Sequence, residues 1–175
     1  MSEHKLLCNK TNIKEFDSFN DEFSLRAISL CPLLNKFQIN VVNHDETTHV
    51  PDDYFNDNDA FVYYLNKEGE DASTTYAEII VNEEMCKHLQ LTEEEIWAAT
   101  AHEIGHIIVF FRSDKETIQD HTEEIYSDGY ACKMGLAAPL SSLLQKMISS
   151  CSYEDWQVKL MKKRLFFIKH LYNYK

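Results

Sequence analysis

Glycine and proline are scarce in this sequence, which has only 4 Gly and 3 Pro among its 175 residues. These two residue types mark turns and linkers, so their scarcity predicts a chain of mostly regular structure without a linker between domains. A chain of this length typically forms one domain, and a hydrophobic content of 44 % is enough to build a core. We therefore expect a single domain over residues 1–175.

Basic charge is scarce as well, because 17 Lys and Arg are outnumbered by 29 Asp and Glu, for a formal net charge of −12. Nucleic-acid binding needs a basic surface, so this balance argues against a protein that binds DNA or RNA. The sequence also lacks the apolar segment of an N-terminal signal peptide, and no run reaches the roughly 18 apolar residues of a membrane span. We expect no transmembrane segment.

Cysteine spacings typical of metal sites and redox sites are absent. The five cysteines stand at positions 8, 31, 86, 132 and 151, and no two of them form a C-x-x-C pair. Their odd number and their spacing favour thiols in a reducing compartment over a framework of disulfides. We therefore expect a cytoplasmic protein.

Residues 93–111, EEEIWAATAHEIGHIIVFF, have the pattern of a helix whose second half is deeply buried. Thr92 and Glu95 match the S/T-x-x-E capping box that begins many helices. Apolar residues then recur at helical spacing, and the last five residues are apolar on every side. Gly105 lies inside this helix, where glycine costs roughly 1 kcal/mol relative to alanine. We expect another backbone to pack close beside it.

The centre of this helix reads His102-Glu103-Ile104-Gly105-His106, an H-E-x-x-H motif. Residues four apart share one face of a helix, so the two imidazoles can bind one Zn²⁺ between them. Glu103 lies beside the first histidine but off that face, which is the position of a general base for a water that the metal activates. The alternative is that both histidines are ordinary helix residues, because the short motif has many chance matches.

A second segment, residues 120–133, reads DHTEEIYSDGYACK and predicts another helix over about residues 121–134. Glu124 and Asp128 are four residues apart and therefore share one face of it. One carboxylate could complete a His₂Glu site that leaves the fourth zinc position open, and Glu124 is our candidate. The other, Asp128, could accept the N–H of a ligand histidine and fix its tautomer.

Two neighbours compete with Glu124 for the third ligand position, namely Glu123 and His121. Glu123 has no acid four residues further on, because Ser127 stands there, and it has the spacing of a capping partner for Asp120. A solvated acidic helix face is the alternative to a metal site. However, the apolar residues of this segment indicate a helix that is partly buried.

HEIGH followed by E-I-Y-S-D resembles the gluzincin pattern, H-E-x-x-H and then E-x-x-x-D, of thermolysin-like and smaller zinc peptidases. The similar stretch covers about residues 74–135. The resemblance implies that His102, His106 and Glu124 are zinc ligands. It also implies that Glu103 is the catalytic acid/base and that Asp128 is the carboxylate that supports the first histidine. It also implies a zincin-like fold.

The short chain is most similar to the compact, single-domain minigluzincins. The stretch also resembles ImmA/IrrE-type metallopeptidases, whose helix ends in a comparable A…L…P run, here Ala131 to Pro139. That second family commonly has Asn where this chain has Asp128. The metzincin pattern is not present, since Val109 stands where its glycine would be and Arg112 where its third histidine would be.

The first half of the chain predicts one helix and three strands. Phenylalanines recur at three- and four-residue steps and predict a helix over about 14–30, stopped before Pro32. Residues 37–42, 60–66 and 74–81 have the composition of strands. The gluzincin resemblance implies that the third is an edge strand, which would pair with an extended peptide substrate. A strand paired on both sides is the alternative.

The C-terminal part predicts a short helical link over residues 83–89, and Gly135 as the residue that ends the second site helix. Two further helices are expected over 139–150 and 153–172. From Trp156 onward there are six Lys and Arg and no acid. Such a helix can bind a membrane surface or an acidic partner, and the simpler interpretation is that it docks on the acidic body of its own chain.

Taken together, these patterns predict an α+β, zincin-like domain that hydrolyses peptide bonds with one catalytic Zn²⁺ and with Glu103 as general base. Its expected partner is a peptide or protein substrate. Two alternatives are a catalytically silent, zinc-stabilised interaction module and a regulatory protease with one specific protein substrate.

Overall fold

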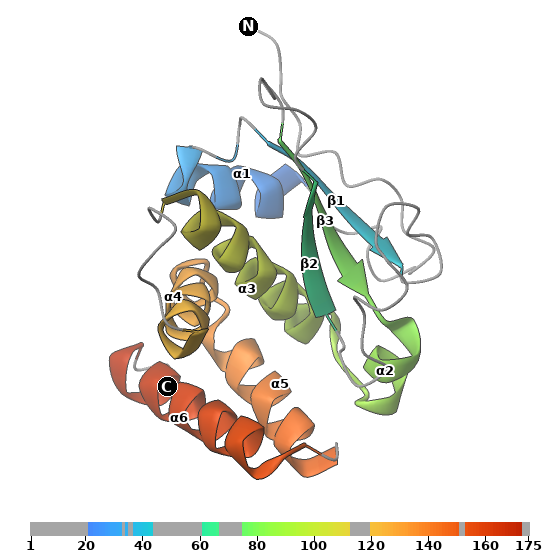
Figure 1. The fold of residues 1–175 in the computed structure, drawn as a ribbon, viewed down its shortest axis with the longest axis vertical. Helices are drawn as coiled ribbons and strands as arrows, with labels where there is room; N and C mark the ends of the chain where they lie inside the picture. Colours follow the sequence, from blue (N-terminus) through green and yellow to red (C-terminus); the bar gives the residue numbers. More distant parts are fainter. Residues whose placement is uncertain are drawn as a thin grey trace, which may run out of the picture. The chain divides into compact units, whose positions relative to one another are not determined.

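The computed structural model describes residues 21–32, 34, 37–43, 61–66, 75–112, 120–150 and 153–172 (Figure 1). Its described elements are mostly helices together with one small sheet, in agreement with the expected α+β class. The packing divides the chain into two compact units, residues 1–86 and residues 87–175. The expectation of one domain stays a prediction.

Helix α1, Asp21–Leu30, is the described part of the N-terminal helix. Phe23 and Ala27 are buried, as the apolar spacing predicts. The N–H of Cys31 donates to the carbonyl of Ala27 and closes the last turn before Pro32. The predicted start of this helix near residue 14 lies outside the described residues.

The three predicted strands are confirmed as β1 (Phe37–Asn43), β2 (Phe61–Asn66) and β3 (Thr75–Val81). They form one sheet in the order β1-β3-β2, in which β3 runs parallel to β1 and antiparallel to β2. The implied edge position of β3 is therefore wrong, because this strand is paired on both sides.

The reason lies in the composition of β3. Residues 77–81 read AEIIV, and all five are at most 3 % exposed, including Glu78. Successive residues of a strand point to opposite faces, so five buried residues in a row show that β3 is covered on both faces, as central strands are. The described part of the sheet thus offers no free edge on β3 for a peptide.

The second unit is built from helices. The short helix α2, Glu83–His88, spans the boundary between the units. It is followed by α3 (Glu93–Arg112), α4 (Asp120–Lys133), α5 (Ala137–Ser150) and α6 (Asp155–Leu171). Helix α3 packs against α4 and α5, and α6 packs against the same two helices (Figure 1).

Two predicted helix ends of this unit are confirmed, the start of α3 and the end of α4. The N–H of Thr92 donates to the Glu95 carboxylate over 2.7 Å, and the N–H of Glu95 donates to the Thr92 hydroxyl over 3.3 Å, which is a capping box. At the end of α4, Gly135 has a φ of 85°, and its N–H donates to the carbonyl of Cys132. The N–H of Leu136 donates to the carbonyl of Ala131 and completes a Schellman motif.

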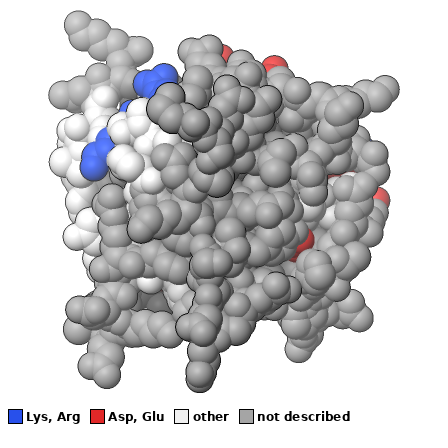
Figure 2. All heavy atoms as spheres, turned by 90° about the horizontal axis from the view of Figure 1, so that it is seen from above, with Lys and Arg blue, Asp and Glu red and all other residues white. Residues whose placement is uncertain are grey.

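The molecular surface carries both signs of charge. Figure 2 presents one face, on which basic and acidic side chains of the described residues both reach the solvent. None of the helices that the structure describes is long and apolar enough to cross a membrane.

Candidate metal centre

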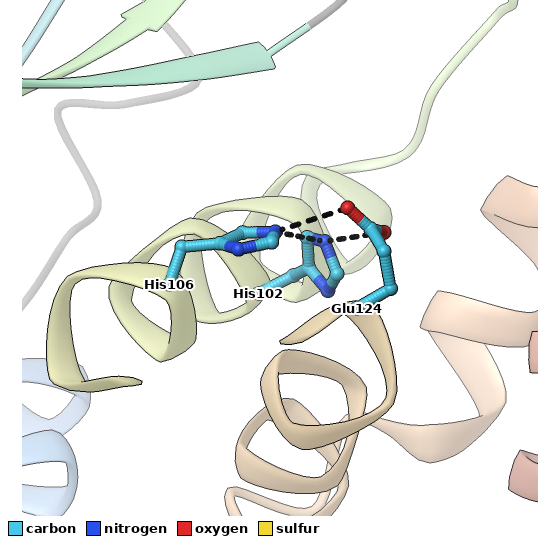
Figure 3. Close-up of side chains that lie close together, drawn as sticks. All are labelled: His102, His106 and Glu124. Carbon is cyan, nitrogen blue, oxygen red and sulfur yellow. Dashed lines mark hydrogen bonds and ion pairs between the residues drawn. The ribbon is translucent and has the colours of Figure 1, made fainter. Parts of the chain in front are cut away.

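Three side chains from α3 and α4 point toward one another (Figure 3). His102 and His106 lie one turn apart on α3, and Glu124 lies in the second turn of α4. The Nε2 atoms of the two imidazoles are 3.0 Å apart. The Glu124 carboxylate reaches both, with Oε2 at 3.5 Å from His102 Nε2 and Oε1 at 3.4 Å from His106 Nε2. The three predicted ligands therefore meet at one place, where they could hold a metal ion.

The spacing of these donor atoms fits a small divalent ion. Zinc binds imidazole nitrogen and carboxylate oxygen at about 2.0–2.2 Å with tetrahedral geometry, which places its donors about 3.3 Å apart. The observed separations of 3.0, 3.4 and 3.5 Å bracket that value. The donor set of two imidazoles and one carboxylate is also one that zinc commonly has in proteins.

The outer nitrogen of each histidine is held by a carboxylate. Asp128 Oδ1 lies 2.9 Å from Nδ1 of His102, as predicted. Glu123 Oε1 lies 2.8 Å from Nδ1 of His106, a contact that the sequence pattern did not reveal. A carboxylate on Nδ1 favours the tautomer whose Nε2 lone pair faces the metal and fixes the orientation of the ring. Both imidazoles are thereby aimed at the same point.

The close approach of α3 and α4 depends on Gly105. A Cβ atom placed on this residue would lie 2.6 Å from the Cα of Ser127 and 3.0 Å from its carbonyl oxygen. Only glycine allows the two backbones to come so near, so the expectation of a second backbone beside it is confirmed. Ser127 lies between Glu124 and Asp128 in the sequence. The same contact therefore sets the distance of both carboxylates from the histidines.

Arg164 of α6 is a member of the site that sequence reasoning missed. Its Nε and Nη2 donate to the two oxygens of Asp128 over 2.8 and 2.7 Å, a bidentate pair. Its Nη1 forms an ion pair with Glu124, and its Nη2 lies 3.3 Å from both ring nitrogens of His102. One guanidinium thus links the ligand carboxylate to the carboxylate that supports the first histidine.

The site is buried and carries an excess of negative charge. His102, His106 and Asp128 are at most 6 % exposed. Four carboxylates lie in this cluster with one guanidinium, and without a metal ion the protonated His106 offsets part of their charge, so a divalent cation could take the place of that proton: Glu103, Glu123, Glu124 and Asp128. Buried charge is costly unless it is balanced. The electrostatics therefore favour binding of a cation.

The pKa values of the site show how strongly its groups interact. Burial alone would lower the pKa of His106, but the carboxylates of Glu123 and Glu124 outweigh it and raise the pKa to about 10. Burial would raise the pKa of Glu124, yet its hydrogen bonds with both histidines hold that pKa far below the usual range. Burial likewise acts to raise the pKa of Asp128, and the charge of Arg164 lowers it.

Glu103 differs from the other carboxylates of the cluster. It is only 8 % exposed, and it does not belong to the group of three donors that meet at the metal position. Burial raises its pKa, while the charges of His106 and His102 act in the opposite direction. A carboxyl group with these properties next to a metal position is suited to take up and release a proton.

Two contributions to the site could not be derived from sequence spacing. Glu123 was considered as a competing ligand and is instead the partner of His106. Arg164 is separated from His102 by 62 positions, and only the packing of α6 on α4 brings it to the cluster. One signal was available, since Arg164 stands on the apolar side of an otherwise amphipathic helix. The side chain of His121, the other competitor, lies outside the described residues.

Comparison with protein-family models found no match, and the searches of curated proteins and of solved structures found none either.

Proposed function

We propose that this protein is a zinc-dependent peptidase of the gluzincin type with a zincin-like fold. The observation that carries the proposal is the meeting of His102 Nε2, His106 Nε2 and the Glu124 carboxylate at one point, with each Nδ1 held by a carboxylate. Among the described residues three donors meet there, and structural zinc sites usually have four. A three-donor site leaves a position open for substrate or water.

Each residue of the site has its own role in the proposed reaction. A zinc ion held by His102, His106 and Glu124 would supply the Lewis acidity that polarises a carbonyl group and lowers the pKa of water. Glu103 accepts the proton of the attacking water at its carboxylate and passes it to the leaving amine. Asp128 and Glu123 keep the imidazoles in the binding tautomer. Arg164 keeps Asp128 ionised and in place.

The first prediction tests the role of Glu103. We expect Glu103→Gln to bind zinc with unchanged stoichiometry and to lose at least about a hundredfold in peptide hydrolysis, because removal of a general base typically has that effect. Turnover of a mixed peptide library and metal content are measured on the same preparations.

Glu94→Gln is the matched control, since Glu94 is an exposed glutamate on the same helix. It should retain full activity. Equal cleavage by the wild-type protein and the Glu103→Gln variant would remove the proposed mechanism.

A second candidate is a catalytically silent module that zinc stabilises for interaction with another protein. The ion pair between Arg164 and Glu124 favours this candidate, because it gives the ligand carboxylate a structural partner from a third helix. Such a module would gain thermal stability from zinc and hydrolyse neither the library nor any folded protein. A regulatory protease would leave the library intact and cleave one protein in a manner that depends on Glu103.

We also propose a cytoplasmic location. The buried thiols of Cys31, Cys86 and Cys132 support it, because free thiols are common in a reducing compartment.

A further inference from the structure

Helix α6 has two faces with different surroundings. The inner face contains Met161, Arg164 and Ile168, which are at most 9 % exposed, and the helix packs there against α4 and α5. The self-docking expected for this basic helix is thus observed for Arg164, which pairs with Asp128 and Glu124. The four lysines of the helix do not share this arrangement.

The outer face of α6 carries a row of side chains in steps of three and four residues. We call these five side chains the outer row: Trp156, Lys159, Lys163, Phe166 and His170. At 1.5 Å per residue the row is about 21 Å long. Trp156 and Phe166 are 56 % and 58 % exposed, which is unusual for such large apolar groups. Phe166 stacks on His170 with ring centroids 3.9 Å apart.

The four lysines beside these aromatic rings form no ion pair within the described part of the chain. Lys162 and Lys169 flank the outer row, and both are exposed like Lys159 and Lys163. None of the ion pairs among the described residues involves any of the four. Two exposed acids, Glu154 and Asp155, stand at the N-terminal end of the helix. Glu154 accepts a hydrogen bond from the Trp156 indole over 2.7 Å.

We propose that the outer face of α6 is a docking surface for an anionic phospholipid bilayer. A helix face that combines exposed aromatic rings with lysines can lie in the plane of a membrane interface. Trp and Phe prefer that interface, and flexible lysines beside them reach the lipid phosphates. The acids elsewhere on the molecule are screened beyond a Debye length of about 8 Å.

The strength of this docking follows from the lysines and the aromatic rings together. Each lysine near an anionic surface strengthens binding by about fivefold, and the contribution falls off within a Debye length. The two aromatic side chains add a part that does not depend on salt. The binding is peripheral and reversible. The residues of the metal centre take no part in it, although Arg164 lies on the same helix.

Sedimentation with vesicles tests the proposal on the full chain. The wild-type protein should bind vesicles of phosphatidylcholine with 30 mol % phosphatidylserine, and not vesicles of phosphatidylcholine alone. Raising the salt concentration from 0.1 to 0.5 M should weaken binding at least about tenfold. The Trp fluorescence should shift to shorter wavelength on binding. Trp156→Phe should abolish this shift, although the variant still fluoresces through Trp97.

Two charge-matched variants decide whether α6 is responsible. Lys159→Glu/Lys163→Glu should lose at least about tenfold in affinity for the anionic vesicles. Lys87→Glu/Lys133→Glu reverses two exposed lysines of other helices, α2 and α4, and should bind like the wild-type protein. Circular dichroism of both variants confirms that they are folded.

Three results would overturn the proposal. The first is the absence of wild-type binding to anionic vesicles, and the second is equal loss in both charge-reversal variants. The third is binding of an oligoglutamate peptide without binding of vesicles, which would assign the surface to an acidic protein partner.

Discussion

At the scale of single residues, the candidate centre depends on positions that differ in kind. His102, His106 and Glu124 provide donor atoms, and their types and spacing make them visible in the sequence. Gly105 provides nothing but the absence of a side chain. Its effect is visible only where Ser127 of α4 lies against it. Mutation therefore tests the two kinds of residue in different ways.

Replacement of Gly105 by alanine should destabilise the protein although alanine is the better helix former. The new Cβ would lie 2.6 Å from backbone of α4, so the helices must separate. We expect the free energy of unfolding to fall by about 1–3 kcal/mol, measured by urea denaturation, because overpacking outweighs the gain in helix propensity.

Gly129→Ala is the matched control within α4. There the new Cβ would approach the hydroxyl of Tyr172 to 3.1 Å, and the end of this partly exposed side chain can move. The stability should stay equal or rise slightly. A Gly105→Ala variant as stable as the wild-type protein would contradict the close packing of α3 and α4.

The partner of the second histidine gives another prediction at this scale. Glu123 holds Nδ1 of His106 at 2.8 Å, so Glu123→Ala should weaken zinc binding by about 10–100-fold, as loss of an outer partner typically does. Competition against a chromophoric chelator measures the affinity. Thr122→Ala changes an exposed neighbour and should leave the affinity unaltered. Equal affinities in all three proteins would show that Glu123 does not support the ligand.

At the scale of helices and strands, the bounds of an element could be predicted from nearby residues, whereas the pairing of strands could not. The capping box at Thr92, the stop at Gly135 and the bounds of α3 follow from residues within a few positions of each other. The place of β3 in the sheet depends on β1 and β2, which are distant in sequence. The gluzincin resemblance implied an edge strand, and the alternative of a strand paired on both sides is the one that the structure shows.

The same distinction applies to the site. His102, His106, Glu124 and Asp128 were predicted because two helical faces with fixed spacing carry them. Arg164 could not be predicted, because no spacing rule relates α6 to α4, and only their packing brings it to Asp128.

The start of α3 offers a prediction on the dependence of stability on pH. Burial acts to raise the pKa of Glu95, but hydrogen bonds from Lys146, Ser142 and the Thr92 N–H outweigh it and lower the pKa. A folded-state pKa below the unfolded value of about 4.5 stabilises the fold above that pH. The contribution is lost as the pH falls through the folded-state pKa.

Glu95→Gln should therefore lower the free energy of unfolding by about 1–3 kcal/mol at pH 7, because charged hydrogen bonds are lost. The difference from the wild-type protein should stay constant above about pH 5 and shrink as the pH falls below about 4.5, toward the lowered pKa of Glu95. Urea denaturation between about pH 3 and 7 measures it. Glu94→Gln, on the exposed side of the same turn, should change stability by less than about 0.5 kcal/mol. A difference that is independent of pH would contradict this account of Glu95.

At the scale of the whole molecule, the candidate centre and the basic helix belong to one unit. Every residue assigned to the metal centre lies between residues 87 and 175, on α3, α4 and α6. Helix α6 contributes its inner face to the centre through Arg164 and presents its lysines outward. Within the described part of this unit, α6 therefore carries exposed lysines on the face away from the site.

The central claim is that two histidines of α3 and one glutamate of α4 together bind a single divalent ion. Zinc titration of the metal-free protein against a chromophoric chelator, with wild type and Glu124→Gln compared, tests it most directly. The wild-type protein should take up one equivalent, and Glu124→Gln should lose more than about a hundredfold in affinity, beyond the loss typical of outer partners. No uptake by the wild-type protein, or equal affinity in the variant, would contradict the claim.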